Sequence, residues 1–202
     1  MTVENIVFDF GGVLIDWNPR YLYRKVFQDE QEMEYFLSNV CSLEWNAALD
    51  KGKPFGQAVE ELSRLYPEYA GQIKLYDTGW EQMCGEEIHG SVDLLYRLKK
   101  HYPVYGLTNW SAEKFALTRP KHKFFDVFDG IVVSGVEKEA KPEPRLFEIL
   151  MERYRLIPEK TVFTDDSAAN IQTAERLGFQ AIRFETPEKL EQALKEKGVV
   201  WD

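Results

Sequence analysis

The sequence predicts an α/β fold in which a parallel β-sheet is flanked by helices and carries a helical insertion. Short apolar runs end at glycine, threonine, serine or aspartate, helical patterns lie between most of them, and one long segment has helical patterns only. Continuous apolar runs are typical of strands that are buried on both faces. Strands that alternate with helices imply crossover connections, and these place the strands parallel to one another.

Five runs have the length and composition of buried strands. They are residues 6–8, 104–107, 130–133, 161–164 and 180–184. Four helices are expected between or after them. They lie around residues 92–98, 146–150, 168–177 and 187–197. Gly178 is suited to end the third of these helices, because glycine adopts the backbone conformation of a helix C-cap without strain.

The segment from residue 16 to residue 87 interrupts this alternation. It contains helical patterns, such as residues 55–66 with Val59, Leu62 and Leu65 on one face, and no good strand pattern. It lies between the first and second predicted strands. We therefore expect two domains, a core formed by residues 1–15 and 88–202 and an all-helical insertion over the carboxyl edge of its sheet.

Composition limits the classes of function. The 202 residues carry a formal net charge of −9 and no long basic run, so a general nucleic-acid surface is not expected. An anionic small molecule would need a local positive site, either a metal ion or a few basic groups. No stretch approaches the roughly 20 apolar residues of a membrane span. The N-terminus lacks the pattern of a signal peptide, and the two cysteines show no disulfide or zinc spacing, so we expect a soluble, cytoplasmic protein.

Reactive side chains follow four of the predicted strands. They are Asp9, then Thr108 and Asn109, then Lys141, and finally Asp165 and Asp166. In open parallel sheets, ligands bind outside the carboxyl ends of the strands. We therefore expect these groups to meet at one place, although they are far apart in the sequence.

These positions carry the motifs of a known family. The segments 8–14 (FDFGGVL), 107–109 (LTN), 141–142 (KP) and 163–167 (FTDDS) resemble, in order, the four motifs of the haloacid dehalogenase (HAD) superfamily. The resemblance covers nearly the whole chain. It implies a Rossmann-like core with a small helical cap inserted after the first motif. It also implies a Mg²⁺-dependent phosphohydrolase of the HAD phosphatase type, acting on a small phosphorylated metabolite, with a sugar phosphate as one compatible class.

The resemblance gives Asp9 the role of nucleophile. Attack on phosphorus would form an aspartyl-phosphate and split one difficult displacement into two easier ones. A carboxylate that approaches a phosphate dianion needs a cation between them. Asp9, Asp165 and Asp166 offer the hard oxygen ligands that Mg²⁺ prefers, and the family also uses the backbone carbonyl at the position of Gly11. Which of Asp165 and Asp166 binds the metal directly is left open, and the pair could instead simply begin the following helix.

Three further positions are candidates for binding phosphate. Lys141 would neutralise the nucleophile and a phosphate oxygen, and we prefer it to Lys138 because Pro142 follows it. Thr108 and Asn109 would donate hydrogen bonds to phosphate oxygens, from the hydroxyl and from backbone N–H. Arg20 is a weaker candidate for contacting a second part of the substrate. Trp17 and Trp110 would lie near the mouth of the site or pack at the hinge.

Gly11 departs from the usual family pattern. Most phosphatases of the superfamily have a second aspartate here, which protonates the leaving oxygen and then activates water. Another group could supply the proton, such as Asp16 or a water molecule. Alternatively, the substrate could have an easily released leaving group, as in an anomeric sugar phosphate or an aryl phosphate. The sequence favours the second route, because no insertion residue is visibly aimed at the site.

Two other functions remain open. A 2-haloacid dehalogenase of the same superfamily would use Asp9 to attack carbon and would need no metal, so the Asp165-Asp166 pair argues against it. A protein that binds a phosphorylated ligand without turnover would explain Gly11, but not the retention of Asp9, Thr108, Lys141 and Asp165. The physiological substrate and the oligomeric state cannot be read from the sequence.

Overall fold

A five-stranded parallel sheet forms the centre of the molecule. The computed structural model describes residues 2–201, and its strand order is β5-β4-β1-β6-β7. The strands are β1 (Asn5–Phe8), β4 (Val104–Thr108), β5 (Gly130–Val133), β6 (Thr161–Asp165) and β7 (Gln180–Arg183). All five predicted strands are present, and the predicted Rossmann-like α/β fold is confirmed.

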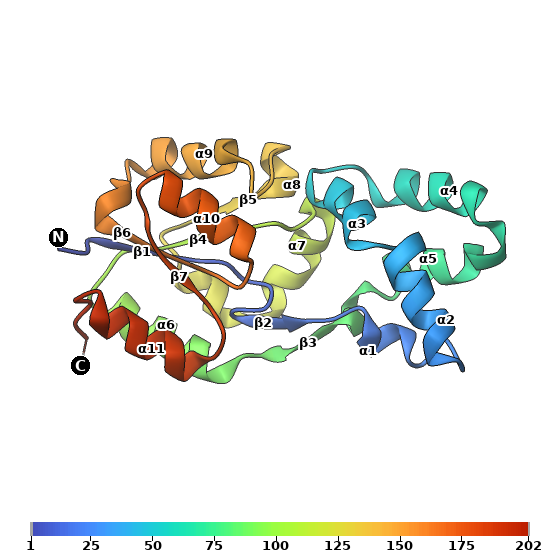
Figure 1. Ribbon diagram of the computed structural model, residues 1–202, viewed down its shortest axis with the longest axis horizontal. Coiled ribbons are helices and arrows are strands. Elements are labelled where there is room, and N and C mark those ends of the chain that lie inside the picture. The colour runs from blue at the N-terminus through green and yellow to red at the C-terminus, as the bar shows by residue number, and fades with distance from the viewer. Residues whose placement is uncertain (1, 202) are drawn as a thin grey trace.

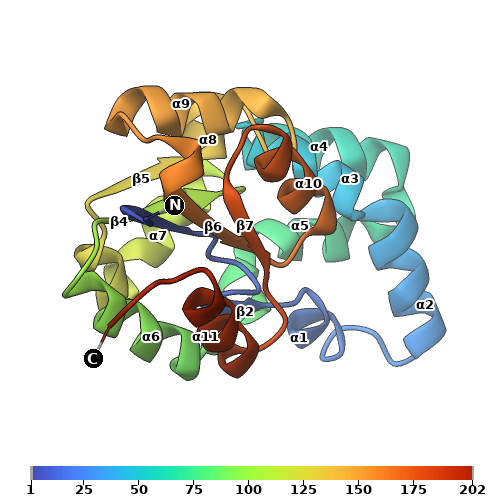
Figure 2. The ribbon, with the colours of Figure 1, turned by 60° about the vertical axis from the view of Figure 1, so that its left-hand side comes forward.

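Helices cover both faces of this sheet (Figures 1 and 2). Helices α9 (Pro144–Tyr154) and α10 (Ala168–Arg176) pack on one face, where Val7, Leu107 and Phe163 are buried beneath them. Helices α6 (His89–Lys99) and α11 (Pro187–Glu196) pack on the opposite face. Adjacent residues of β1 therefore contribute to different faces, as expected for a strand whose side chains alternate. The short helices α7 (Ala112–Thr118) and α8 (Ser134–Glu137) follow β4 and β5.

The insertion forms a second lobe, seen on the right of Figure 1. Its helices are α1 (Arg20–Tyr23), α2 (Glu30–Tyr35) with a π-helical continuation (Phe36–Val40), α3 (Leu43–Asp50), α4 (Phe55–Leu65) and α5 (Ala70–Thr78). Aromatic rings fill its interior, with Tyr23 at 4.9 Å from Phe36 and Trp45 at 5.0 Å from Tyr76 between ring centroids. We refer to this lobe as the cap.

The cap joins the core through a small antiparallel ribbon. Strand β2 (Ile15–Trp17) pairs with β3 (Cys84–Glu87), so the chain enters and leaves the cap side by side. Strand β3 lies within residues 16–87, where the sequence shows no strand pattern. The sequence does not reveal β3, because Gly85, Glu86 and Glu87 lack an alternation of apolar and polar residues and the strand is only partly buried. Among the described residues, β3 pairs with β2 alone.

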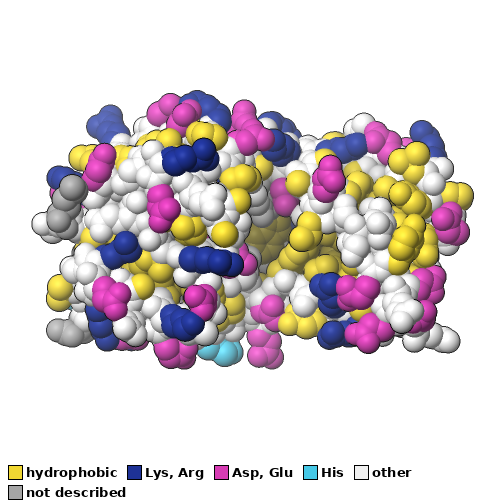
Figure 3. All heavy atoms as spheres, viewed as in Figure 1, with side chains coloured by type: hydrophobic (Ala, Val, Ile, Leu, Met, Phe, Trp, Pro, Cys, Tyr) yellow, Lys and Arg dark blue, Asp and Glu magenta, His cyan; other side chains and the backbone are white. Residues whose placement is uncertain are grey.

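The carboxyl ends of the central strands face the cap. Figure 3 shows that the surface is hollowed where the two lobes meet. Parallel pairing aligns Phe8 with Thr164 and Gly106, so the residues that follow β1, β4 and β6 emerge at one edge of the sheet. None of the helices in residues 2–201 combines the length and the hydrophobicity of a membrane span.

Candidate active site

Asp9 is held at the carboxyl end of β1. Its main-chain N–H donates to the carbonyl of Thr164 at 2.9 Å, which extends the pairing with β6 by one residue. Its Oδ1 accepts from the N–H of Phe10 at 2.7 Å. The side chain of Phe10 then packs beneath the loop against Phe125, at 5.0 Å between centroids. Buried apolar residues on both sides of Asp9 therefore fix the direction of its carboxylate.

Lys141 places a buried ammonium between two carboxylates. Its Nζ lies 2.9 Å from Oδ1 of Asp9 and 2.7 Å from Oδ2 of Asp165, and it donates to the carbonyl of Leu107 at 2.7 Å. Burial by itself lowers the pKa of Lys141, but Asp165 and Asp9 outweigh this effect, so its pKa is raised and the group stays charged. Lys138 lies elsewhere, with its Nζ donating to the carbonyl of Gly52 at 3.1 Å.

The two adjacent aspartates have different surroundings. Asp165 is completely buried and accepts hydrogen bonds from Lys141, from the N–H of Ser167 at 2.8 Å and from Asn170 Nδ2 at 2.9 and 3.0 Å. Asp166 is more exposed and lines the cavity described below. The carboxylate of Asp165 is thus hydrogen-bonded to other protein groups, whereas the carboxylate of Asp166 faces the cavity.

Asp9, Asp165 and Asp166 form a group suited to a cation. Ligand oxygens from all three lie within 4.8 Å of one another. Burial raises the pKa of Asp9 to about 7, opposed by the charge of Lys141 and reinforced by that of Asp165. Burial and the charge of Asp165 likewise raise the pKa of Asp166. Three carboxylates face one ammonium, so the donor set has an excess of hard, negatively charged oxygens, which suits Mg²⁺.

Thr108 ends β4, and Asn109 follows it. The hydroxyl of Thr108 is buried and has no hydrogen-bond partner within residues 2–201. The side chain of Asn109 bonds to the main chain of Lys141, and the expected donor at Asn109 is instead its main-chain N–H. Asn109 Nδ2 donates to the Lys141 carbonyl, and the Lys141 N–H donates to Asn109 Oδ1, both at 2.8 Å. This pair of bonds fixes the Lys141-Pro142 turn, whose peptide bond is cis.

The two glycines after Asp9 have different constraints. Gly12 has a φ of +74°, and a Cβ added there would lie 2.6 Å from Oδ2 of Asp166. Gly12 therefore allows β1 and the Asp166 loop to approach closely. A Cβ added at Gly11 meets nothing within 4 Å. The absence of a side chain at Gly11 is thus not a requirement of packing.

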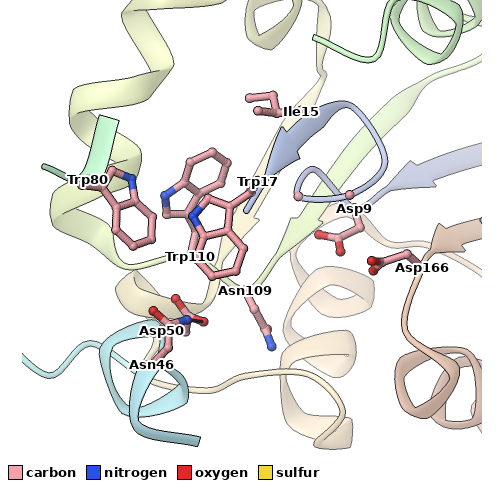
Figure 4. Close-up of a pocket in the computed structure, with 11 residues that line it drawn as sticks. Asp9, Ile15, Trp17, Asn46, Asp50, Trp80, Asn109, Trp110 and Asp166 are labelled. Carbon is pink, nitrogen blue, oxygen red and sulfur yellow. Dashed lines mark hydrogen bonds between the residues drawn. The ribbon is translucent and has the colours of Figure 1, made fainter. Parts of the chain in front are cut away.

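A cavity of about 230 Å³ connects these groups with the cap. Its lining residues come from both lobes (Figure 4): Asp9, Gly11, Gly12, Ile15, Trp17, Asn46, Asp50, Trp80, Asn109, Trp110 and Asp166. Trp17 and Trp110 line it, which agrees with the first of the two placements considered for them. Asn46, Asp50 and Trp80 were not expected there, because in the sequence they are ordinary members of cap helices and turns with no neighbouring motif.

Two candidates from the sequence lie outside this cavity. Arg20 forms a bidentate ion pair with Glu34. Its Nε donates to Oε1 at 2.6 Å, and a terminal guanidinium nitrogen donates to Oε2 at 2.5 Å. Asp16, which was considered as a substitute acid, accepts from the hydroxyl of Tyr21 and lines a different surface hollow beside β3. The structure therefore brings together Asp9, Gly11, Thr108, Asn109, Lys141, Asp165 and Asp166 but leaves out Arg20 and Asp16.

Comparison with known proteins identifies the family of this chain. The family model described as haloacid dehalogenase-like hydrolase matches residues 3–178. The chain belongs to this family. Among HAD-like relatives, a sesquiterpene phosphatase of Aspergillus oryzae is 28% identical over 91% of this chain and 90% of its own length. A D-ribitol-5-phosphate phosphatase of Bacteroides thetaiotaomicron is 26% identical over 91% of this chain and 92% of its own length.

Solved HAD structures share the fold. A HAD family enzyme from Bacteroides thetaiotaomicron, in complex with magnesium and inorganic phosphate, superimposes with a TM-score of 0.70. It is 24% identical, and the match covers 91% of this chain and 95% of that one. The L-2-haloacid dehalogenase from Xanthobacter autotrophicus gives a TM-score of 0.67 at 14% identity, covering 98% of this chain and 85% of that one. The predicted family and fold are thus confirmed, and the chain is a hydrolase of the HAD type.

Proposed function

We propose that this protein is a Mg²⁺-dependent phosphoric monoester hydrolase that acts on a small phosphorylated metabolite. The observation that carries the proposal is the convergence of Asp9, Lys141, Asp165 and Asp166 at one end of the sheet, where Asp9 and Asp166 line a cavity. The names of the two relatives, a sesquiterpene phosphatase and a D-ribitol-5-phosphate phosphatase, support the same reaction class.

Asp9 is the nucleophile in this proposal. Its Oδ attacks phosphorus, the bond to the ester oxygen breaks, and the phosphoryl group is carried on Asp9 until water displaces it. Lys141 offsets the charge of the attacking carboxylate. The buried hydroxyl of Thr108, which has no hydrogen-bond partner in the described part of the chain, is available to a phosphate oxygen.

Asp9, Asp166 and the carbonyl of Gly11 would hold the metal ion. When bound, Mg²⁺ supplies positive charge to the phosphate oxygens and lowers the repulsion between phosphate and carboxylate. Asp165 has a different role in this assignment. Because its carboxylate already accepts from Lys141, Ser167 and Asn170, it positions the lysine and the following loop.

A dehalogenase is the second candidate, because the L-2-haloacid dehalogenase shares the fold. Attack on carbon needs no cation, and the gathering of three carboxylates would then only raise the cost of burying charge. The cluster of three carboxylates therefore favours a phosphatase over a dehalogenase. It also favours a phosphatase over a protein that binds phosphate without turnover.

The test is a scan of phosphate release over a panel of phosphorylated metabolites, with p-nitrophenyl phosphate as a general probe. We expect turnover that is lost with a chelator and restored by Mg²⁺. L-2-chloropropionate serves as the probe for dehalogenation. Chloride release that persists in the chelator, with no phosphate release from the panel, would contradict the proposal.

A further inference from the structure

The cavity contains one carboxyl group that the proposed mechanism does not use. Among its lining residues, Asp9 and Asp166 belong to the phosphate end, and the remaining acid is Asp50 of the cap. Figure 4 places Asp50 and Asn46 on the cap side of the cavity, across from Asp9 and Asp166, with Asn109 between the two groups. The position of Gly11, where the family usually has a proton donor, lies in the same cavity.

Hydrogen bonds hold the Asp50 carboxyl group in this position. Asn46 Nδ2 donates to Asp50 Oδ2 at 2.8 Å, and Asn46 in turn accepts from the hydroxyl of Tyr76 at 3.1 Å. The main-chain N–H of Ser111, from the core, lies near enough to the carboxylate to lower its pKa. The carbonyl of Asp50 accepts from Ser134 Oγ at 2.6 Å. Asp50 is thus tied to both lobes.

The surroundings of Asp50 favour a proton on its carboxyl group near neutral pH. Burial raises its pKa to about 7, opposed by the positive charge of Lys141 and by the main-chain N–H of Ser111. It lies at the C-terminal end of α3, where the helix dipole also disfavours a negative charge. An acid–base catalyst works best when its pKa is close to the working pH.

Other titratable groups lie around Asp50, and those on the adjoining segments have partners of their own. They are Lys141, Asp9 and Asp166 across the cavity, Tyr76 behind Asn46, and Lys51, Lys138 and Glu113 on the adjoining segments. Lys51 pairs with Glu143 at 2.5 Å, Lys138 donates to the Gly52 carbonyl, and Glu113 accepts from the N–H of Phe55 at 3.2 Å. None of these described contacts places a cation other than Lys141 against the Asp50 carboxyl group.

We propose that Asp50 is the proton donor and acceptor of the reaction, supplied by the cap in place of a side chain at Gly11. The inference rests on the proposed phosphatase function. In the first step the bond from Asp9 to phosphorus forms, the bond from phosphorus to the ester oxygen breaks, and Asp50 gives its proton to that oxygen. In the second step Asp50 takes a proton from the attacking water, the bond between Asp9 and phosphorus breaks, and inorganic phosphate leaves.

This role makes a prediction that depends on the leaving group. An alkoxide needs a proton as it leaves, whereas p-nitrophenolate does not. Asp50→Asn keeps the shape of the side chain and can still accept from Asn46. We expect its kcat/KM for ribitol 5-phosphate, a primary alkyl phosphate, to fall by roughly 10²–10⁴-fold. With p-nitrophenyl phosphate we expect a first turnover within about tenfold of wild type, followed by slow hydrolysis of the intermediate.

The experiment therefore compares rapid-mixing kinetics of wild type, Asp50→Asn and Asp16→Asn on both substrates. Asp16→Asn is the matched control, because it removes a cap carboxylate that lies outside the cavity. Calorimetry with Mg²⁺ alone should give the same affinity for all three proteins, and thermal unfolding should show that each is folded. The fall of alkyl phosphate hydrolysis at high pH should be present in wild type and absent in Asp50→Asn.

Three results would overturn the role of Asp50. They are an equal loss of the first-turnover rate on both substrates, no loss on ribitol 5-phosphate, and an effect of Asp16→Asn as large as that of Asp50→Asn. A wild type that releases phosphate from neither substrate nor from the metabolite panel contradicts the proposed function itself, and the inference then falls with it. Wild-type activity on p-nitrophenyl phosphate with no activity on any alkyl phosphate retains the phosphatase but contradicts the need for a donor.

Discussion

Lys141 Nζ lies 2.9 Å from Oδ1 of Asp9, and both groups are buried at the carboxyl edge of the sheet. The lysine comes from the segment after β5, more than a hundred residues beyond the aspartate. Their ion pair nevertheless restricts the conformations of both side chains. Because Lys141 also contacts Asp165, the ammonium remains fixed when Asp9 changes its charge. This geometry leads to the first prediction.

Asp9→Asn should lower kcat on the order of 10⁴-fold or more, because an amide of the same shape cannot attack phosphorus. Lys141 keeps its ion pair with Asp165, so we expect the melting temperature to fall by no more than about 4 °C. Phosphate release and thermal unfolding of the purified variant measure the two effects. Wild-type hydrolysis by a folded Asp9→Asn protein would remove Asp9 from the mechanism.

Asp166→Asn and Asp165→Asn should have separable effects. Asp166 faces the cavity, so its replacement should weaken Mg²⁺ binding by roughly tenfold or more with little change in stability. Asp165 is buried against Lys141, and its replacement should lower the free energy of unfolding by about 3 kcal/mol. Calorimetry and urea denaturation measure these quantities. The assignment is wrong if Asp165→Asn loses the metal more completely than Asp166→Asn does.

Much of this site could be predicted from the sequence because its residues follow buried strands. Parallel pairing carries the ends of β1, β4 and β6 to one edge, so Asp9, Thr108 and Asp165 had to lie near one another. The cap does not follow such a rule. Its helices show which face is buried, but the orientation of a cap over a sheet depends on packing between distant segments. Asp50 and Asn46 were therefore missed, and Arg20 was given a role that its ion pair with Glu34 does not support.

The stability of the metal-free protein should depend on pH through Asp50. Its pKa is raised from 3.8 to about 7, so between these values the carboxyl group is protonated in the folded state and ionised in the unfolded state. The folded state then binds more protons, and stability is lost as the pH rises through this window. One such group contributes a slope of at most about 1.4 kcal/mol per pH unit. Urea denaturation from pH 4.5 to 7 should give a shallower decline for Asp50→Asn than for wild type.

Gly12→Ala should be more damaging than Gly11→Ala. A side chain at Gly12 is strained at a φ of +74° and would contact Asp166 Oδ2, whereas a Cβ at Gly11 has open space. We expect Gly12→Ala to lower the free energy of unfolding by about 1–3 kcal/mol, and Gly11→Ala by less than about 1 kcal/mol. The measurement is urea denaturation of both variants without metal. Equal losses would show that the close approach of Gly12 to Asp166 is not rigid.

Gly11→Asp tests whether a donor can return to the position that the family usually uses. The open space beside Gly11 should accommodate the side chain. Introduced together with Asp50→Asn, it should raise activity on ribitol 5-phosphate at least about tenfold above that of the Asp50→Asn variant. It should change the first turnover of p-nitrophenyl phosphate little. The single Asp50→Asn variant is the reference. A double variant that gains equally on both substrates would show that the aspartate acts by another route than protonating the leaving oxygen.

The β2–β3 ribbon ties both ends of the cap to the core at one place. A movement of the cap about this ribbon would leave Asp9, Lys141, Asp165 and Asp166 together, because all four belong to the core. It would separate Asp50 from them, along with its contacts to Ser111 and Ser134. In the proposed mechanism, the nucleophile Asp9 and the proton donor Asp50 therefore belong to different lobes. With the cap open, Asp9 and Lys141 would remain in place, but the leaving oxygen of an alkyl ester would receive no proton from Asp50. Proton transfer would therefore occur only when the cap has closed over a bound substrate, and little reaction would take place in the open state.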